Sequence, residues 1–180
     1  MKLHRMIATA FLAVFLMGIA TPAFAGEIVL GYWKTIDDKT KSKKSIVKIF
    51  KKGGKYFGKI IRLFRKPSQD QNPKCTKCTD HRKNKPIIGM QILENLKKAP
   101  SKWKGRDWYN KGKILDPNNG KIYGTWISPT NDGKKLLVRG FIGFSLIGRS
   151  QTWLRAKKPV TKKPAKRKAE KKEEKNPAAR

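Results

Sequence analysis

Short runs of apolar residues, separated by turn-forming residues at fairly regular intervals, dominate the central part of the chain. The runs are rich in Val, Ile, Phe, Tyr and Trp, which favour strands, and their spacing is typical of an all-β protein. The candidate strands are residues 28–36, 44–51, 55–64, 86–96, 101–108, 111–115, 121–127, 134–144 and 150–155.

The segments between these runs have the composition of tight turns. Lys52-Gly53-Gly54-Lys55 suits a two-residue hairpin loop, and Asp116-Pro117-Asn118-Asn119-Gly120 and Asn131-Asp132-Gly133 suit longer turns. Consecutive hairpins without helical crossovers predict an antiparallel up-and-down barrel of about eight strands, because closure removes exposed sheet edges.

Residues 44–66 also fit a second interpretation. Their apolar residues, placed among lysines, resemble a cationic amphipathic helix that would lie on a membrane. Two adjacent glycines, Gly53 and Gly54, would cost such a helix about 2 kcal/mol relative to alanine, whereas a hairpin turn favours them. The hairpin is therefore the expected structure.

The two ends of the chain differ from its middle. Lys2 and Arg5 precede an uncharged run over 7–20, and Ala23-Phe24-Ala25 follows, which predicts a secretory signal cleaved after Ala25. Residues 156–180 are rich in Lys and contain no aromatic residue, so we expect a disordered tail. The domain between them is residues 26–155, and the expected location is the periplasm or outside the cell.

The charge of the chain is strongly positive. The 180 residues carry a net charge of +32, and residues 26–155 alone hold 31 Lys and Arg against 9 Asp and Glu, a net charge of +22. A polycation of this kind suits anionic lipid or anionic polymers better than it suits a typical enzyme. Lysines outnumber arginines 34 to 10, which favours non-specific phosphate contact over base reading.

In a barrel of this size the interior is either filled by side chains or holds one small ligand. Alternation over 136–143 leaves one parity mostly apolar, but it does not say which parity faces inward. The large rings that could line or fill the interior are Tyr56, Trp126, Phe141, Phe144 and Trp153.

Five segments in order along the chain resemble a known family. They are Gly31–Thr35, Pro73–Cys78, Pro86–Met90, Gly112–Pro117 with Gly120 and Tyr123, and Gly140–Arg149 running into Gln151-Thr152-Trp153. Together they resemble a family of small exported bacterial proteins of unknown function that is similar in fold to lipocalins. The resemblance covers about residues 31–155.

This resemblance implies a lipocalin-like barrel, binding of a small apolar molecule and no established catalysis. Gly31-x-Trp33 looks like the lipocalin signature on the first strand, where Trp33 would close the barrel floor against a basic residue of the last strand. Arg155 is the first candidate partner and Arg149 the second, by stacking of the cation on the ring.

The two cysteines, Cys75 and Cys78, lie in the long connection between the third and fourth candidate strands. In an exported chain the favoured state is a local disulfide that stiffens a lid over one barrel mouth. Two alternatives stay open, namely a redox pair and a metal site that adds Asp80 and His81.

We assign no catalytic residue, metal ligand or cofactor. Four aspartates sit in turn-like contexts, where they are expected to form turns: Asp37, Asp38, Asp116 and Asp132. Catalysis through His81 or through carboxylates that meet in space stays open as an alternative.

The predicted function is therefore an exported, non-enzymatic envelope protein that binds a small apolar or amphipathic ligand in its barrel. The alternative is a polycationic scaffold that binds nucleic acid, acidic polysaccharide or anionic membrane surfaces through its lysines.

Overall fold

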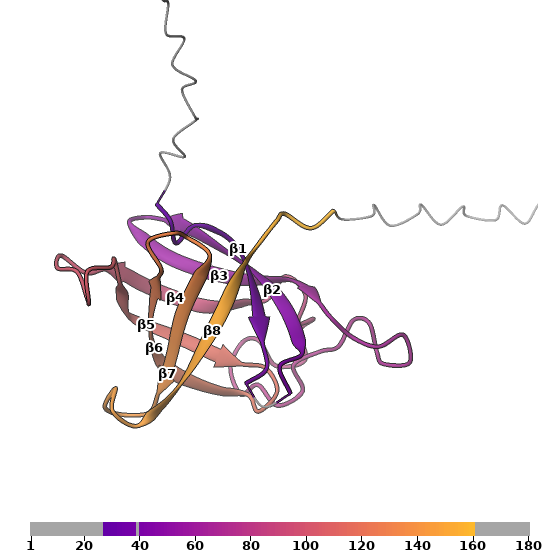
Figure 1. Ribbon diagram of the computed structural model, residues 1–180. Coiled ribbons are helices and arrows are strands. Elements are labelled where there is room, and N and C mark those ends of the chain that lie inside the picture. Colours follow the sequence, from indigo (N-terminus) through magenta and orange to yellow (C-terminus); the bar gives the residue numbers. More distant parts are fainter. Residues whose placement is uncertain (1–26, 39, 161–180) are drawn as a thin grey trace, which may run out of the picture.

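The computed structural model describes residues 27–38 and 40–160, which form one closed antiparallel barrel (Figure 1). Each strand pairs with the next along the chain, and the last pairs with the first. The predicted up-and-down barrel is confirmed. The eight strands are β1 (Gly31–Ile36), β2 (Lys43–Lys52), β3 (Lys55–Leu63), β4 (Gln91–Lys98), β5 (Tyr109–Asp116), β6 (Lys121–Pro129), β7 (Lys135–Phe141) and β8 (Gly148–Ala156).

The hairpin between β2 and β3 settles the interpretation of residues 44–66. Gly53 and Gly54 have φ values of 54° and 72°, and Lys52 and Lys55 face each other across the turn. Positive φ at two successive residues reverses the chain and ends any helix, since α-helical residues need negative φ. The amphipathic helix is therefore wrong for this segment.

One of the nine candidate strands does not form. Residues 101–108 belong to the connection between β4 and β5, where Trp103 and Arg106 bridge each other across a tight turn. Lys104 and Gly105 occupy the turn with φ values of 50° and 72°. The predicted strand at 101–108 is wrong because these two residues fold the segment back on itself, so it cannot extend along a neighbour.

Three other strands are shorter than predicted. The candidate over 28–36 becomes a strand only at Gly31, which has a φ of 108°. The candidate over 86–96 becomes a strand only at Gln91, after a connection in which Gly89 has a φ of 90°. The candidate over 134–144 ends at Phe141, and Gly143, with a φ of 66°, lies in the following turn. All three errors arise where a glycine with positive φ turns the chain out of the sheet.

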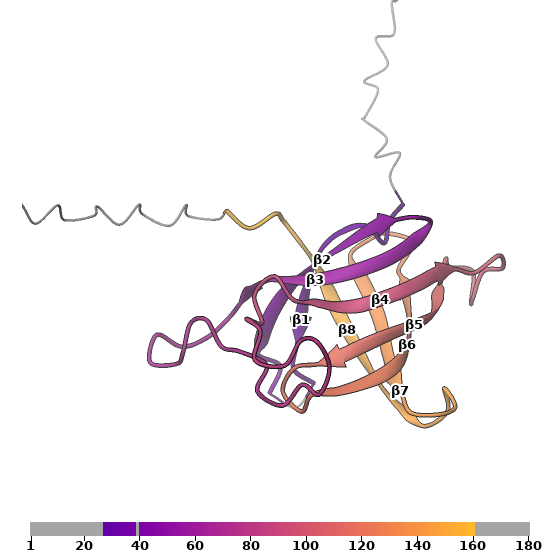
Figure 2. The same ribbon diagram turned by 180° about the vertical axis from the view of Figure 1, so that it is seen from behind.

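The barrel has two ends, which we call the base and the rim. The base comprises residues 27–30 and the β2–β3, β4–β5 and β6–β7 connections, and the rim comprises the β1–β2, β3–β4, β5–β6 and β7–β8 connections. Both faces of the molecule show the strands inclined around a common axis (Figures 1 and 2). The termini of the described chain leave from the base, so the rim carries hairpins and the long connection over 64–90.

The interior is filled toward the base. Strand residues with inward parity there are almost fully buried: Trp33, Val47, Ile49, Tyr56, Leu96, Tyr109, Ile127, Leu136 and Trp153. Bulky rings and branched chains at this density make a packed core. Within the part of the chain that the structure describes, no helix is long and apolar enough to cross a membrane.

Candidate ligand-binding site

The base of the barrel is sealed by a cation on a ring. The Arg155 guanidinium lies 3.8 Å from the centroid of the Trp33 indole, and the two residues are cross-strand partners of β8 and β1. Trp33 is buried, and its indole N–H donates to the Val29 carbonyl at 2.8 Å. The cation thus covers the ring at the floor of the barrel, where a stacked arginine adds attraction to the ring quadrupole.

Arg155 also donates hydrogen bonds to three backbone carbonyls at the base. Its Nε donates to the Gly133 carbonyl at 2.8 Å and Nη1 to the Leu30 carbonyl at 2.7 Å, and Nη2 donates to the Ile28 carbonyl. Burial lowers the pKa of Arg155, and the three carbonyls stabilise the charge that burial disfavours. One side chain therefore joins the N-terminal segment, the β6–β7 turn and the last strand.

A second polar group covers the base beside this seal. Glu27 accepts hydrogen bonds from the Tyr56 hydroxyl and from Lys51 Nζ, the latter at 2.8 Å. Burial raises the pKa of Glu27, but the hydrogen bonds from Lys51 and Tyr56 outweigh it, so the net pKa is lowered. The carboxylate therefore stays charged and holds residues 27–30 over the base.

Tyr109 contributes a polar atom inside the barrel. Its ring packs edge-on against Tyr56, with the centroids 4.6 Å apart, and the residue is fully buried. Among the described residues its hydroxyl finds no hydrogen-bond partner, and burial raises the pKa of Tyr109. A buried hydroxyl without a partner is costly, so it offers a donor and acceptor to a small polar group.

The five rings expected to line or fill the interior divide into two groups. Tyr56 and Trp153 face inward and are buried in the core. Trp126 lies on the outer face of β6, where Trp103 and Trp108 pack against it. Phe141 lies across Gly124 on the outer face, and Phe144 is 80% exposed in the β7–β8 connection. The expected inward placement is therefore wrong for Trp126, Phe141 and Phe144.

Toward the rim, four inward-facing residues of β5–β8 remain partly exposed. A Cβ atom at Gly140 would lie 3.6 Å from Ile114 Cγ2 and 3.7 Å from Tyr123 Cβ, so these three residues meet inside the wall. Gln151 has the same inward parity, and its Oε1 accepts from the Trp153 indole N–H at 3.2 Å. All four are half-buried, unlike the residues toward the base.

Sequence reasoning missed this group of Ile114, Tyr123, Gly140 and Gln151. Gly140 gave the available signal, because a glycine among branched residues leaves space on the inner wall. Polar side chains lie at the same end, where the Thr35 and Ser45 hydroxyls hydrogen-bond each other at 2.8 Å. The rim half of the interior is therefore amphipathic.

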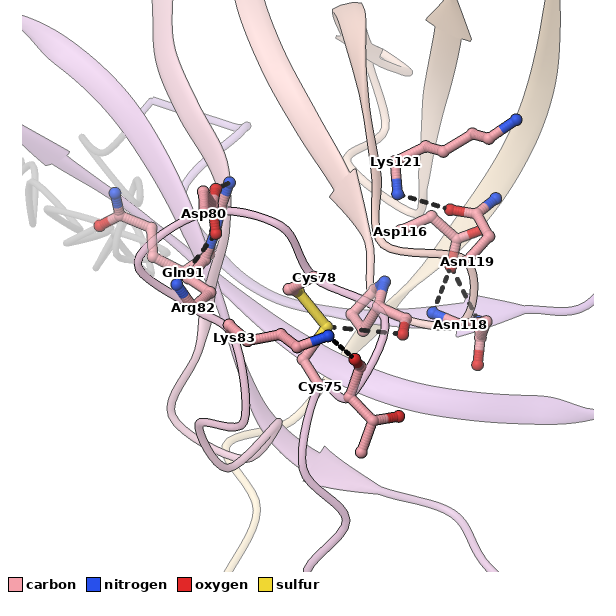
Figure 3. Close-up of a disulfide and its surroundings, with 12 residues drawn as sticks. Cys75, Cys78, Asp80, Arg82, Lys83, Gln91, Asp116, Asn118, Asn119 and Lys121 are labelled. Atoms are coloured by element: carbon pink, nitrogen blue, oxygen red, sulfur yellow. Dashed lines mark hydrogen bonds and ion pairs between the residues drawn. A yellow bond between two sulfur atoms is a disulfide. The ribbon is translucent and has the colours of Figure 1, made fainter.

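The long connection over 64–90 contains a local disulfide that packs against the rim (Figure 3). Cys75 and Cys78 are bonded, both are buried, and the β5–β6 turn lies beside them. A Cβ at Gly120 of this turn would come within 1.8 Å of the Lys77 carbonyl oxygen. The disulfide is confirmed, and the stiffened lid remains a prediction. Bonded sulfurs leave no thiolate to bind a metal ion, whereas a disulfide is also the oxidised form of a redox pair.

Charged groups fix the same connection to β4. Arg82 is buried, and its guanidinium binds Asp80 and the Glu94 carboxylate, the latter at 2.9 Å. It also donates to the Gln91 carbonyl at 2.9 Å. The hydrogen bonds from Arg82 lower the pKa of Asp80 to about 2, so the Asp80–Arg82 pair stays charged at any pH well above that value.

Two grooves lie outside the barrel wall. One of about 560 Å³ runs between the β1–β2 connection and β8, and its lining includes Asp38 and Leu154. The other, of about 470 Å³, lies between β4 and the 64–90 connection and includes His81 and Glu94. Both are open and lined by charged groups, so neither has the apolar enclosure of a typical ligand site.

Three of the four aspartates expected to form turns accept hydrogen bonds from nearby backbone N–H groups. The Asp116 and Asp132 carboxylates accept backbone N–H groups two residues ahead, at 2.9 and 3.0 Å. Asp37 caps the β1–β2 turn by accepting the Thr40 N–H, and Asp38 binds Arg149 at 2.6 Å. Within residues 27–38 and 40–160, no group of three or more His, Cys, Asp or Glu is placed to hold a metal ion.

The fold and the sealed base together define a lipocalin-like β-barrel. The chain belongs to the family described as "Uncharacterized protein conserved in bacteria (DUF2147)", which matches residues 31–155. Among solved structures it is similar in fold to one described as "Protein HP1028 from the human pathogen Helicobacter pylori belongs to the lipocalin family". That similarity has a TM-score of 0.59 and 21% sequence identity, over 71% of this chain and 82% of that chain. Comparison with curated proteins finds no match.

Proposed function

We propose that this protein binds a small apolar or amphipathic molecule at the rim half of its barrel. The fold supports the proposal, because barrels of eight strands have an interior of the size that holds one small ligand. The observation that carries it is the contrast between the two halves of the interior. Residues at the base are packed and sealed, whereas Ile114, Tyr123 and Gly140 face inward and remain accessible.

The groups around this position suit a ligand with a polar or anionic end. Arg149 is the cross-strand partner of Gly140 and shares its inward parity at the rim, where it is ion-paired with Asp38. A carboxylate or phosphate on the ligand would meet this guanidinium, while its apolar part would contact Ile114 and Tyr123. The Tyr109 hydroxyl, which has no partner among the described residues, lies in the packed base half and is not part of this position.

The proposal includes the setting in which the protein works. The sequence pattern of a signal at residues 1–25 supports export to the periplasm or beyond, although this segment lies outside the described residues. The Lys-rich tail, predicted to be disordered, begins at Ala156, which the structure places in β8, and residues 161–180 also lie outside the described part. We propose a binding role without catalysis.

A pair of substitutions at Gly140 tests the site. Gly140→Ala adds a methyl at ordinary contact distance from Ile114 and Tyr123, so it should fold and bind as the wild type does. Gly140→Phe projects a ring into the same space and should reduce affinity for dansyl-labelled undecanoic acid by about tenfold or more. Fluorescence titration measures the affinity, and circular dichroism checks that both variants fold.

Neither substitution changes a charge, which separates barrel binding from adsorption to lysines. If the probe binds all three proteins equally and high salt releases it, the polycationic scaffold is the better account. If none of the three proteins takes up the probe, and native mass spectrometry after exposure to mixed bacterial lipids finds no bound molecule, the ligand-binding proposal fails.

A further inference from the structure

The β7–β8 connection, residues 142–147, carries an exposed apolar tip on a strongly basic protein. Its four large apolar side chains are exposed by 63% at Ile142, 80% at Phe144, 88% at Leu146 and 72% at Ile147. No residue from Gly140 to Gly148 is charged. Single exposed apolar residues are normal on a protein surface, whereas several adjacent ones indicate an interaction surface.

The backbone of this tip is held in place. Arg139 Nε donates to the Ser145 carbonyl at 2.7 Å, and its Nη2 donates to the Leu146 carbonyl at 2.8 Å. Inside the tip, the Ile147 N–H donates to the Phe144 carbonyl at 3.1 Å. These bonds hold the backbone of the tip in one arrangement, so little backbone conformational entropy is lost when the tip binds.

The tip projects away from the barrel at its rim (Figure 1). Its convex shape and its lack of side-chain hydrogen-bonding groups, apart from Ser145, suit a soft apolar medium better than a shaped protein groove. Figure 2 shows the same projection from behind, with the loops of the rim at the same end of the strands.

The charge around the tip indicates what that medium is. The other rim connections, residues 37–42, 64–90 and 117–120, contain nine Lys and Arg against four Asp. Basic residues beside an apolar insertion favour a surface of anionic lipid, each contributing about 1 kcal/mol near a charged membrane. A second copy of this chain is disfavoured, because both barrels carry the same large positive charge and would repel.

We propose that residues 142–147 insert into the interface of an anionic lipid bilayer and seat the rim of the barrel on it. Phe144 and Leu146 enter the region between headgroups and acyl chains, and the lysines and arginines of the rim contact phosphates. This places the accessible half of the barrel interior against the membrane. The inference is independent of ligand binding, since insertion needs only the tip and the surrounding charge.

The test compares two double variants of the full chain. Phe144→Ser with Leu146→Ser removes the two most exposed side chains of the tip, whereas Ile28→Ser with Val160→Ser removes two exposed apolar side chains at the opposite end of the barrel. Co-sedimentation with phosphatidylcholine vesicles containing phosphatidylglycerol measures the partition coefficient. The tip variant should lower it by about tenfold or more, and the control should leave it unchanged.

A monolayer experiment separates insertion from adsorption. The wild type should raise the surface pressure of a phosphatidylglycerol film, and the tip variant should not. Equal vesicle binding by the tip variant and the wild type would overturn the proposal, as would equal losses in both double variants. A change from dimer to monomer in the tip variant, with vesicle binding unchanged, would identify a self-association surface and equally overturn it.

Discussion

At the scale of single residues, Arg155 does more than any other side chain to close the base. It stacks on Trp33 and binds three backbone carbonyls from two separate segments. Only a guanidinium combines a flat cationic face with a fork of N–H donors, so a lysine at this position would keep the charge but lose most of the geometry.

Arg155→Lys should therefore destabilise the fold by about 1–3 kcal/mol, the cost of leaving buried carbonyls without donors. Arg149→Lys is the matched control, because Arg149 lies in the same strand and makes one exposed ion pair worth about 0–1 kcal/mol. Urea denaturation of the two variants measures the difference. Equal midpoints would show that Arg155 has no special role at the base.

Residue roles could be predicted from the sequence only in part. Trp33 and Arg155 were expected together through the resemblance to lipocalins, and the structure places them in contact. The inward or outward direction of Trp126 could not be predicted, because alternation defines two faces without ranking them. The register of β6 places Trp126 outside, where Trp103 and Trp108 cover it from a connection that folds back.

At the scale of elements, local turn chemistry decided what the sequence could predict. The β2–β3 hairpin was predictable, since Gly53 and Gly54 are adjacent and their turn needs no distant partner. The prediction for residues 101–108 was wrong because their composition favours a strand, whereas Lys104 and Gly105 form a turn. Trp103, beside this turn, packs against Trp126.

The contact between the long connection over 64–90 and the β5–β6 turn can be tested by substitution. A methyl at Gly120 would meet the Lys77 backbone at 1.8 Å, whereas at Gly53, also at positive φ, a methyl meets nothing within 4 Å. Gly120→Ala should therefore lower stability by about 1–3 kcal/mol more than Gly53→Ala. Thermal unfolding of both variants measures this difference.

Hydrogen exchange adds a local readout to this comparison. In Gly120→Ala, amides of the connection around Cys75 and Cys78 should exchange faster than in the wild type, because the connection can no longer pack closely against the β5–β6 turn. Unchanged exchange in this segment, with equal stability of the two variants, would mean that the connection does not depend on its contact with the β5–β6 turn.

At the scale of the whole molecule, the barrel is asymmetric along its axis. The base is closed by Trp33, Arg155 and Glu27, while the rim combines inward-facing residues that remain partly exposed with an exposed apolar tip. The sequence alone predicted the closed sheet and its charge. It could not predict the asymmetry, because that depends on which strand ends meet around the barrel.

This asymmetry is the central claim, and amide chemical shifts test it most directly. The isotope-labelled protein is titrated with dansyl-labelled undecanoic acid. The largest changes in amide chemical shift should fall on Ile114, Tyr123 and Gly140, and the amide chemical shifts of Trp33 and Arg155 should not change. Shift changes confined to the outer grooves, or spread evenly over surface lysines, would contradict the account.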